Sequence, residues 1–287
     1  YGAKSLSPYE TMFNEDFNGD GIIGVDVSKL VKVTTDTTGV TLARDPEGGL
    51  YLISAAGNQA TAVGNAGWLE YNNSYNTTDY YKREAIAVEA LSDGSGYKLA
   101  MKTTSKWGGN AEQVTYDVLH LDATGKLTNG VMENGSWKDL SSWGVKSLTP
   151  YETIFNQDFN NDGFIGIDVS KLTTVSTDSK GIVLARDADL GLYMVDNTGA
   201  TPKATAVTNG GWLEYSNNWG NGYNKREVVA IEAIKDGATI TGFKLAVKNT
   251  NKYDTNPEQV TYDILTLNTE GKQVYGNSVN GVWTDPN

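Results

Sequence analysis

The sequence predicts a mainly β protein, α+β overall, made of two tandem copies of a small antiparallel β-sheet or sandwich domain. Three observations predict this class. The string NEDFNGDGIIGVD at 14–26 returns as NQDFNNDGFIGID at 156–168. Each half carries one helix start signal. Elsewhere, short runs of β-forming residues alternate with turn signals, and the 32 glycines suit a turn-rich chain.

The repeat extends over nearly all of each half. Similarity at so long a period indicates duplicated whole domains rather than a short-period solenoid. The pattern restarts at SSWG near Ser142, so we expect one repeat domain over 1–142 and a second over 143–287. The matching segments are 3–30 with 145–172, 39–52 with 181–194, 67–71 with 211–215, 82–90 with 225–233, 97–102 with 243–248 and 112–126 with 258–272.

Each copy is expected to open with one short helix. Ser7 is placed to be its N-cap, Pro8 suits the first helical position, and Glu10 completes a capping box. The helix would end near Asn14, where an acidic loop begins. The second copy repeats the pattern with Thr149, Pro150, Glu152 and Asn156.

The acidic loop has oxygen-bearing side chains at the spacing of an EF-hand. Asp16, Asn18 and Asp20 take positions 1, 3 and 5, and a glycine at position 6 permits the sharp turn. The backbone carbonyl at position 7 belongs to Ile22. Calcium is a hard cation that prefers such oxygen ligands, so we predict a calcium site in this EF-hand-like loop. The second copy offers Asp158, Asn160, Asp162 and Phe164.

The last ligand of the loop departs from the EF-hand pattern. The acidic residue falls one place early, at Asp26 in the first copy and Asp168 in the second. Either the loop is one residue shorter, or its last ligand comes from elsewhere. The following VDVSKLVKV at 25–33 is expected to be a strand rather than a helix. The alternative is a surface turn rich in Asn, Asp and Gly without metal; recurrence after the same helix favours calcium.

The remainder of each copy is expected to form strands. YKLAMK at 97–102 alternates apolar with polar or small residues, as a half-buried strand does. REAIAVEAL at 83–91 and QVTYDVLHL at 113–121 are rich in strand-forming residues. Turn signals such as DGSG at 93–96 separate them, which favours antiparallel neighbours.

These segments together resemble the tryptophan-rich C-terminal domain family. The resemblance rests on a helix with YET, the loop DFNxDGxIG, the YKLA or FKLA strand and the QVTYD strand, and it covers both copies almost entirely. It implies a repeat of large bacterial secreted and cell-surface proteins, commonly near calcium-binding repeats, adhesins or extracellular hydrolases, and implies no catalytic residues. Family repeats often have Trp in two strands where this chain has Met101, Val247, Val118 and Ile264.

Aromatic residues gather among Asn, Ser, Thr and Gly in two loops of each copy. Flat rings can cover the apolar face of a sugar while amides and carboxylates bind its hydroxyls. The candidates for a polysaccharide site are Tyr75, Tyr80, Trp107, Trp219, Tyr223 and Tyr253. Two alternatives are rings packed on the sheet and contacts between neighbouring domains; the latter best suits Trp137, Trp143 and Trp283.

We expect no enzyme. The chain has no Cys, its one His is His120, and no nucleophile elbow, phosphate loop or HExxH motif is found. Carboxylates do recur, and a glycosidase pair would need two of them about 5–10 Å apart. Glu84 and Glu227 adjoin Lys-Arg, which favours ion pairing instead. The recurring pairs are Glu70/Glu214, Glu84/Glu227, Glu89/Glu232 and Asp117/Asp263.

Charge and hydropathy exclude some partners. The net charge of −12 argues against nucleic acid or an anionic membrane surface, since both need a basic face. No apolar run approaches the ~18 residues of a membrane-spanning helix. Tyr1 is not an initiator Met, so we expect a fragment or a mature product.

The predicted function is therefore a non-catalytic, calcium-binding tandem repeat module of an extracellular or cell-surface bacterial adhesin, biofilm matrix or filament protein. Calcium would stabilise each repeat, and neighbouring repeats or extracellular polysaccharide would be partners. The alternative is a carbohydrate-binding module that uses the exposed Trp and Tyr loops.

Overall fold

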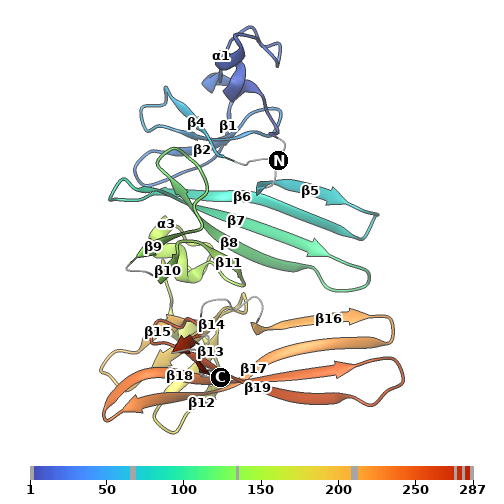
Figure 1. The fold of residues 1–287 in the computed structure, drawn as a ribbon, viewed down its shortest axis with the longest axis vertical. Coiled ribbons are helices and arrows are strands. Elements are labelled where there is room, and N and C mark those ends of the chain that lie inside the picture. Colours follow the sequence, from blue (N-terminus) through green and yellow to red (C-terminus); the bar gives the residue numbers. More distant parts are fainter. Residues whose placement is uncertain are drawn as a thin grey trace. The chain divides into compact units, whose positions relative to one another are not determined.

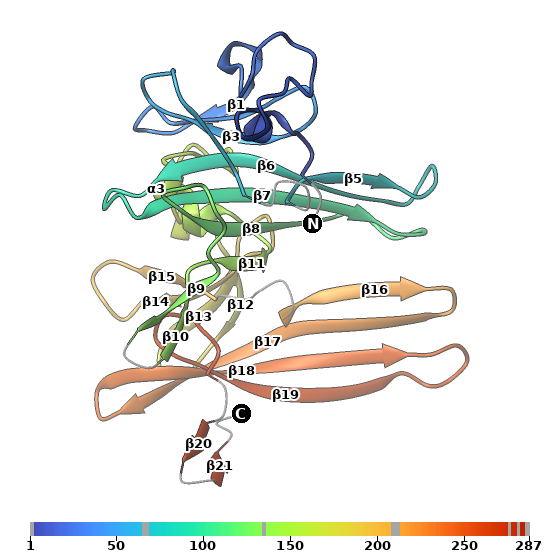
Figure 2. The same cartoon turned by 45° about the horizontal axis from the view of Figure 1, so that its top comes forward.

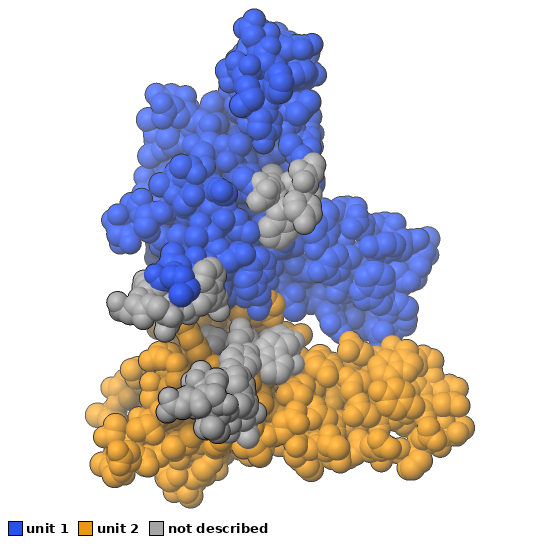
Figure 3. Space-filling model, viewed as in Figure 1, with its two compact units in different colours: residues 1–143, 153–157 blue, residues 144–152, 158–287 orange. Residues whose placement is uncertain are grey.

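The computed structural model describes residues 3–64, 69–133, 136–207, 213–274, 277–279 and 282–284. In this part the chain is mainly β, with antiparallel sheets and two short α-helices, which confirms the predicted mainly β character (Figure 1). Contacts divide the chain into two units (Figure 3). Unit 1 comprises 1–143 and 153–157, and unit 2 comprises 144–152 and 158–287.

Unit 1 starts with helical turns and a four-stranded sheet. The 3-10 helix η1 (Ser7–Tyr9) continues into α1 (Glu10–Phe13), which ends at Asn14 in the left-handed conformation with φ 51°. The acidic loop follows, and then the 3-10 helix η2 (Val27–Lys29). The first sheet has the order β1-β2-β3-β4, with bounds Val31–Thr35, Thr41–Arg44, Leu50–Ile53 and Ala60–Ala62.

The second sheet of unit 1 carries the long strands. Its order is β11-β8-β7-β6-β5, so β11 lies beside β8 at one edge although β9 and β10 intervene in sequence. Figures 1 and 2 show β6, β7 and β8 running side by side beneath the first sheet. The bounds are β5 Tyr71–Ser74, β6 Tyr80–Ala90, β7 Gly96–Lys106, β8 Gln113–Asp122 and β11 Ser142–Val145, with a separate hairpin of β9 Gly130–Glu133 and β10 Ser136–Asp139.

The second half of the chain has elements in a similar order. η3 (Thr149–Tyr151) and α3 (Glu152–Phe155) precede the second acidic loop and η4 (Val169–Lys171). One sheet has the order β12-β13-β14-β15, with bounds Thr173–Thr177, Ile182–Arg186, Leu192–Asp196 and Lys203–Ala206. The other has the order β16-β17-β18-β19, with bounds Tyr215–Trp219, Gly222–Asp236, Thr239–Lys252 and Gln259–Leu267; β20 (Asn277–Val279) pairs with β21 (Val282–Thr284).

Each unit is a sandwich whose two large sheets share one apolar core. In unit 1, Leu42 and Leu52 of the first sheet belong to the same buried cluster as Leu99 and Leu119 of the second. A corresponding cluster in unit 2 joins β13 and β14 to β17, β18 and β19. Burial of these side chains, at about 25 cal/mol per Å² of apolar surface, is the main favourable term that holds each pair of sheets together.

Two local predictions are wrong. No side chain caps η1, whose N-cap position is Leu6, because the Glu10 carboxylate is turned toward the acidic loop instead. The segment 25–33 is not one strand. Asp26 caps η2 by accepting a hydrogen bond from the Ser28 N–H, so the strand begins only at Val31.

Candidate functional sites

The first acidic loop is folded around the carboxylate of Asp16. Its Oδ1 accepts hydrogen bonds from the Gly19 N–H at 2.7 Å and the Asp20 N–H at 3.2 Å, and its Oδ2 accepts from the Gly21 N–H at 2.9 Å. Gly21 has φ 86°, a conformation that favours glycine. The turn therefore gathers the oxygen-bearing side chains of three alternate residues around one short stretch of backbone.

The next two oxygen donors are also fixed by the backbone. Asn18 Oδ1 accepts from the Asp20 N–H at 2.9 Å, and Asp20 Oδ1 accepts from the Ile22 N–H at 2.8 Å. The Asn18 amide nitrogen donates to Asp20 Oδ2 at 3.2 Å and to Ser7 Oγ at 3.0 Å. Short turns of this kind hold Asx side chains in place without help from a helix.

The second loop repeats these bonds almost one for one. Asp158 accepts from the Asp162 N–H at 3.2 Å and the Gly163 N–H at 2.9 Å. Asn160 accepts from the Asp162 N–H at 2.9 Å, and Asp162 accepts from the Phe164 N–H at 2.8 Å. The same sequence pattern thus produces the same loop at both places.

A buried glutamate that the sequence reasoning assigned to a helix cap supports the first loop. Glu10 is fully buried, and its carboxylate accepts the N–H groups of Phe17 at 3.1 Å, Asn18 at 3.3 Å and Gly24 at 2.8 Å. These donors lie at both ends of the loop, so one side chain closes it. The signal that could have revealed this role is the recurrence of Glu after Pro-Tyr before both loops.

Glu152 has the same role in the second loop. It accepts the N–H groups of Phe159 at 3.0 Å, Asn160 at 3.3 Å and Gly166 at 2.9 Å. Burial raises the pKa of the Glu152 carboxyl, although the hydrogen bonds from Gly166, Phe159 and Asn160 oppose the shift.

The two predicted last ligands, Asp26 and Asp168, each form hydrogen bonds with a serine two residues further along the chain. Asp26 Oδ1 accepts from the Ser28 N–H at 2.9 Å and the Ser28 hydroxyl at 2.7 Å, and Asp168 bonds to Ser170 in the same way. The hydroxyl hydrogen bond is the largest cause that lowers the pKa of Asp26, and the same holds for Asp168. Both carboxylates are therefore ionised at neutral pH and located just after the loops.

The donor set suits a hard cation. Each loop supplies carboxylate, amide and carbonyl oxygens, and calcium takes six to eight such ligands, part of them from water. Within the described ranges, no group of three or more His, Cys, Asp or Glu side chains that could hold a metal was found. The loops carry two carboxylates each, Asp16 with Asp20 and Asp158 with Asp162, so amide and backbone oxygens would have to complete the ligand set.

The aromatic candidates are brought together in pairs at the tips of neighbouring hairpins. Tyr75, after β5, and Trp107, after β7, have ring centroids 5.1 Å apart. In the second half, Trp219 and Tyr253 are 5.7 Å apart. The exposed fractions of the four side chains are 60%, 46%, 43% and 53%, so each pair presents aromatic surface to solvent.

Polar contacts connect the two loops beneath the first pair. Asp79 Oδ1 accepts the Gly108 N–H at 2.6 Å, and the Asn76 amide donates to Asp79 Oδ2 at 2.7 Å. The Asn76 hydrogen bond is the largest cause of the lowered pKa of Asp79. The Tyr80 hydroxyl donates to Glu112.

The second pair has related polar contacts. The Tyr223 hydroxyl donates to Glu258, and Asn221 donates to Asp254 at 3.4 Å. Tyr80 and Tyr223 therefore lie next to carboxylates rather than in the ring pairs. For the interdomain alternative, Trp143 is 41% exposed and lies 5.9 Å from the Arg83 guanidinium, while the side chains of Trp137 and Trp283 lie outside the described residues.

The recurring carboxylates all have partners. Glu70 forms a two-point contact with Arg44, at 2.8 Å and 2.5 Å, and accepts the Ala85 N–H at 2.6 Å. Arg186 and Glu214 form the same pair in the second half. The others bond to neighbours as follows: Asp117 to Arg83, Asp263 to Arg226, Glu84 to Lys82, Glu227 to Lys225, Glu232 to Lys180 and Glu89 to Thr37.

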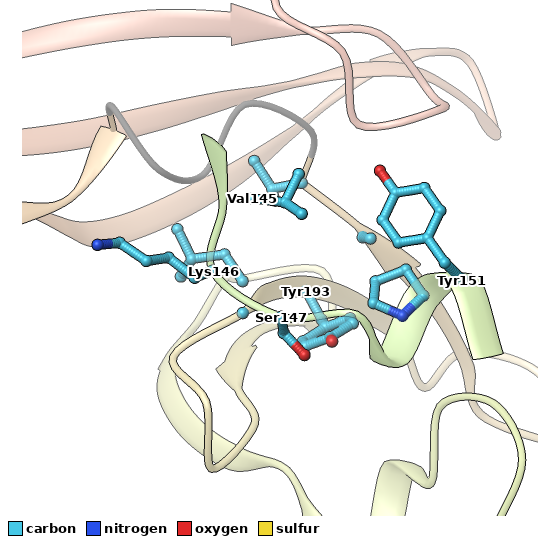
Figure 4. A pocket seen from close by; sticks show the side chains of 10 residues that line it. Val145, Lys146, Ser147, Tyr151 and Tyr193 are labelled. Carbon is cyan, nitrogen blue, oxygen red and sulfur yellow. The ribbon is translucent and has the colours of Figure 1, made fainter. Parts of the chain in front are cut away.

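Burial shifts the pKa of His120 and of two residues that line a small pocket. His120 is buried in β8, and burial is the largest cause that lowers its pKa. In unit 2, a small pocket lies between Val145–Ser147, Tyr151 and Tyr193 (Figure 4). Burial lowers the pKa of Lys146 and raises that of Tyr193, whose hydroxyl donates to Asp187 at 2.5 Å.

Comparison with protein families, curated proteins and solved structures found no match to this chain. A search of the described residues for helices long and apolar enough to cross a membrane found none.

Proposed function

We propose that the chain consists of two tandem copies of one domain, each with an EF-hand-like calcium loop, and serves as a non-catalytic repeat module of an extracellular bacterial adhesin, matrix or filament protein. The observation that carries this proposal is that the two loops share most of their hydrogen bonds and that each is closed by a buried glutamate. The resemblance to the tryptophan-rich C-terminal domain family supports the proposed extracellular location.

In this proposal a calcium ion binds the carboxylates of each loop and so offsets the repulsion between them. Asp16, Asn18 and Asp20, with the Ile22 carbonyl, would hold the ion in the first loop, and Asp158, Asn160, Asp162 and the Phe164 carbonyl in the second. Asp26 and Asp168 stay candidates for the remaining ligand. A ligand that binds only the folded state adds stability by mass action, so calcium would stiffen each repeat.

The experiment is thermal unfolding of Asp20→Ala/Asp162→Ala in calcium and in chelator. We expect the double variant to melt below the wild type in calcium and together with it in chelator. Asp236→Ala, an exposed carboxylate at the end of β17, is the matched control and should follow the wild type in both. Equal loss of stability in both conditions would contradict the proposal.

Glycan binding is the second candidate function, and the exposed ring pairs favour it. Tyr75 with Trp107 and Trp219 with Tyr253 offer adjacent aromatic faces, and the carboxylate of Asp79, bonded to the Gly108 N–H next to Trp107, could accept hydrogen bonds from sugar hydroxyls. Two such sites in one chain would bind a polymer with avidity.

Affinity electrophoresis in polysaccharide gels tests this candidate. We expect one polysaccharide to retard the wild type and Trp143→Ala but not Trp107→Ala/Trp219→Ala. Trp143 is the matched control because it is as exposed as Trp219 but belongs to neither pair. If the double variant is retarded as strongly as the wild type, the ring pairs are not the site.

A further inference from the structure

Ser7 and Thr149 occupy the same position in the two halves of the chain, as the first residues of the 3-10 helices η1 and η3. Neither side chain caps its helix, yet both are buried, with an exposed fraction of 3% each. Burial of a hydroxyl is costly unless the group is hydrogen bonded. The partner of each hydroxyl therefore indicates why it lies there.

The partner of each hydroxyl is the amide of a loop asparagine 11 residues later in the chain. Asn18 Nδ2 donates to Ser7 Oγ at 3.0 Å, and Asn160 Nδ2 donates to Thr149 Oγ1 at 3.1 Å. Because one half uses Ser and the other uses Thr, the feature that the two halves share at this contact is the hydroxyl itself.

These contacts settle which way each amide faces. The Asp20 N–H, which can only donate, lies 2.9 Å from the other end of the Asn18 amide, so that end is the oxygen. The nitrogen directs its two hydrogens to Ser7 Oγ and Asp20 Oδ2. If the amide turned over, its nitrogen would face the Asp20 N–H, and two donors would oppose each other. The second loop repeats this arrangement.

Ser7 is itself held by a buried polar cluster. Ser5 Oγ accepts the Ser7 N–H at 3.2 Å, and the two hydroxyls are hydrogen bonded at 3.2 Å. The Tyr51 hydroxyl lies 3.4 Å from Ser5 Oγ and donates to Asp45 Oδ2 at 2.7 Å. A Cβ atom on Gly49 would lie 2.9 Å from Ser5 Cβ and 3.0 Å from the Tyr51 hydroxyl, so the cluster is closely packed. The position of the Ser7 hydroxyl is therefore fixed by its surroundings.

The second half supports Thr149 in the same way. Ser147 Oγ accepts the Thr149 N–H at 3.2 Å, and the two hydroxyls are hydrogen bonded at 3.0 Å. Tyr193, which lies next to Ser147 in Figure 4, donates to Asp187 at 2.5 Å. A Cβ atom on Gly191 would lie 2.8 Å from Ser147 Cβ and 2.9 Å from the Tyr193 hydroxyl.

We propose that Ser7 and Thr149 are positioning residues of the two calcium loops: each hydroxyl binds the amide nitrogen of the loop asparagine and keeps the amide oxygen available to the ion. That oxygen accepts one N–H and has a second lone pair. A cation is attracted by the amide oxygen and repelled by the amide N–H groups, so an amide that is free to turn over is a weaker ligand. This role rests on the calcium binding in the proposed function.

Calcium titrations followed by NMR would separate the two loops. The Gly21 and Gly163 N–H groups donate to the first aspartate of their loops, so their signals report the first and the second loop respectively. Calcium up to about 30 mM covers a tenfold weakening of the about 0.1–1 mM dissociation constants of extracellular modules. Ser7→Ala and Thr149→Val each remove one hydroxyl, whereas Ser7→Thr and Thr149→Ser keep it.

We expect Ser7→Ala to raise the dissociation constant of the first loop about tenfold, as is usual when a group that orients a metal ligand is removed. The second loop should be unchanged, and Thr149→Val should have the reverse effect. The unaltered loop is the matched control in each protein, and its signal also reports whether the variant has folded. Ser7→Thr and Thr149→Ser should bind calcium as the wild type does.

A measurement without calcium examines the contact itself. In chelator, the side-chain NH₂ signals of Asn18 should shift in Ser7→Ala and not in Thr149→Val. If the wild type binds calcium and Ser7→Ala binds it equally well, the positioning role is refuted and the calcium proposal stands, even where the variant is less stable. If the wild type shows no saturable calcium shift in either loop, the calcium proposal fails and this role fails with it.

Discussion

Glu10 shows how one buried side chain can organise a surface loop. Its carboxylate has no exposed area, yet it accepts three backbone N–H groups from the two ends of the acidic loop. A buried acceptor must be satisfied in this way, because an unpaired polar group in the interior is costly. Glu10 thus fixes the two ends of the loop whose oxygens we propose as calcium ligands.

Glu10→Gln should therefore be more damaging than its small change in shape suggests. The amide nitrogen would face a backbone N–H donor, so we expect a loss of about 1–3 kcal/mol in the free energy of unfolding. Urea denaturation measures it. Glu15→Gln, an exposed residue one turn later, is the control and should lie within about 0.5 kcal/mol of the wild type. Equal stabilities of the two variants would contradict this role.

The part played by Glu10 could not be predicted from its neighbours. The pattern Ser-Pro-Tyr-Glu satisfies the capping-box rule, and that rule considers only contacts within one helical turn. The actual partners are 7, 8 and 14 residues away, at places fixed only when the loop has folded. In contrast, the bonds of Asp16 to the following residues span only three to five positions, so they depend on local sequence alone.

The two sheets of each unit are joined by a two-point ion pair as well as by the apolar core. Arg44 lies on β2 of the first sheet and donates to Glu70 and to the Ala85 carbonyl on β6 of the second. Glu70 in turn accepts the Ala85 N–H. Arg186 and Glu214 connect β13 and β17 in the same manner.

Glu70→Ala should destabilise the fold by about 3 kcal/mol, because it leaves the Arg44 charge and the Ala85 N–H without their partner. Glu84→Ala provides the contrast. Its contact with Lys82 is exposed, so we expect a loss of only about 0–1 kcal/mol. Urea denaturation of both variants checks the difference. If both variants lost a similar free energy of unfolding, the Arg44–Glu70 pair would contribute no more to stability than an exposed ion pair.

The strands themselves were predictable, but the partners of their ends were not. Alternation and β-forming residues located 97–102 and 113–121 within β7 and β8. The ring pairs depend on contacts between loops, since Tyr75 and Trp107 follow different strands and meet only after β6 and β7 have paired. The placement of β11 beside β8 likewise depends on a pairing between distant segments.

Repetition dominates the molecule as a whole. A similar loop, a loop-closing glutamate, an Arg–Glu ion pair and an exposed pair of aromatic rings occur in both halves. The buried glutamate and the ion pair have structural roles, since the glutamate closes the loop and the ion pair joins the two sheets. The exposed loops and rings contribute little to the apolar core, so we propose that they bind ligands.

Calorimetric titration of calcium into the chelator-treated protein tests the calcium module most directly. We predict saturable binding at two sites per chain, with dissociation constants of about 0.1–1 mM as in extracellular modules, and loss of both sites in Asp20→Ala/Asp162→Ala. Absence of saturable heat up to about 10 mM calcium, ten times the weakest value expected for such modules, would contradict it.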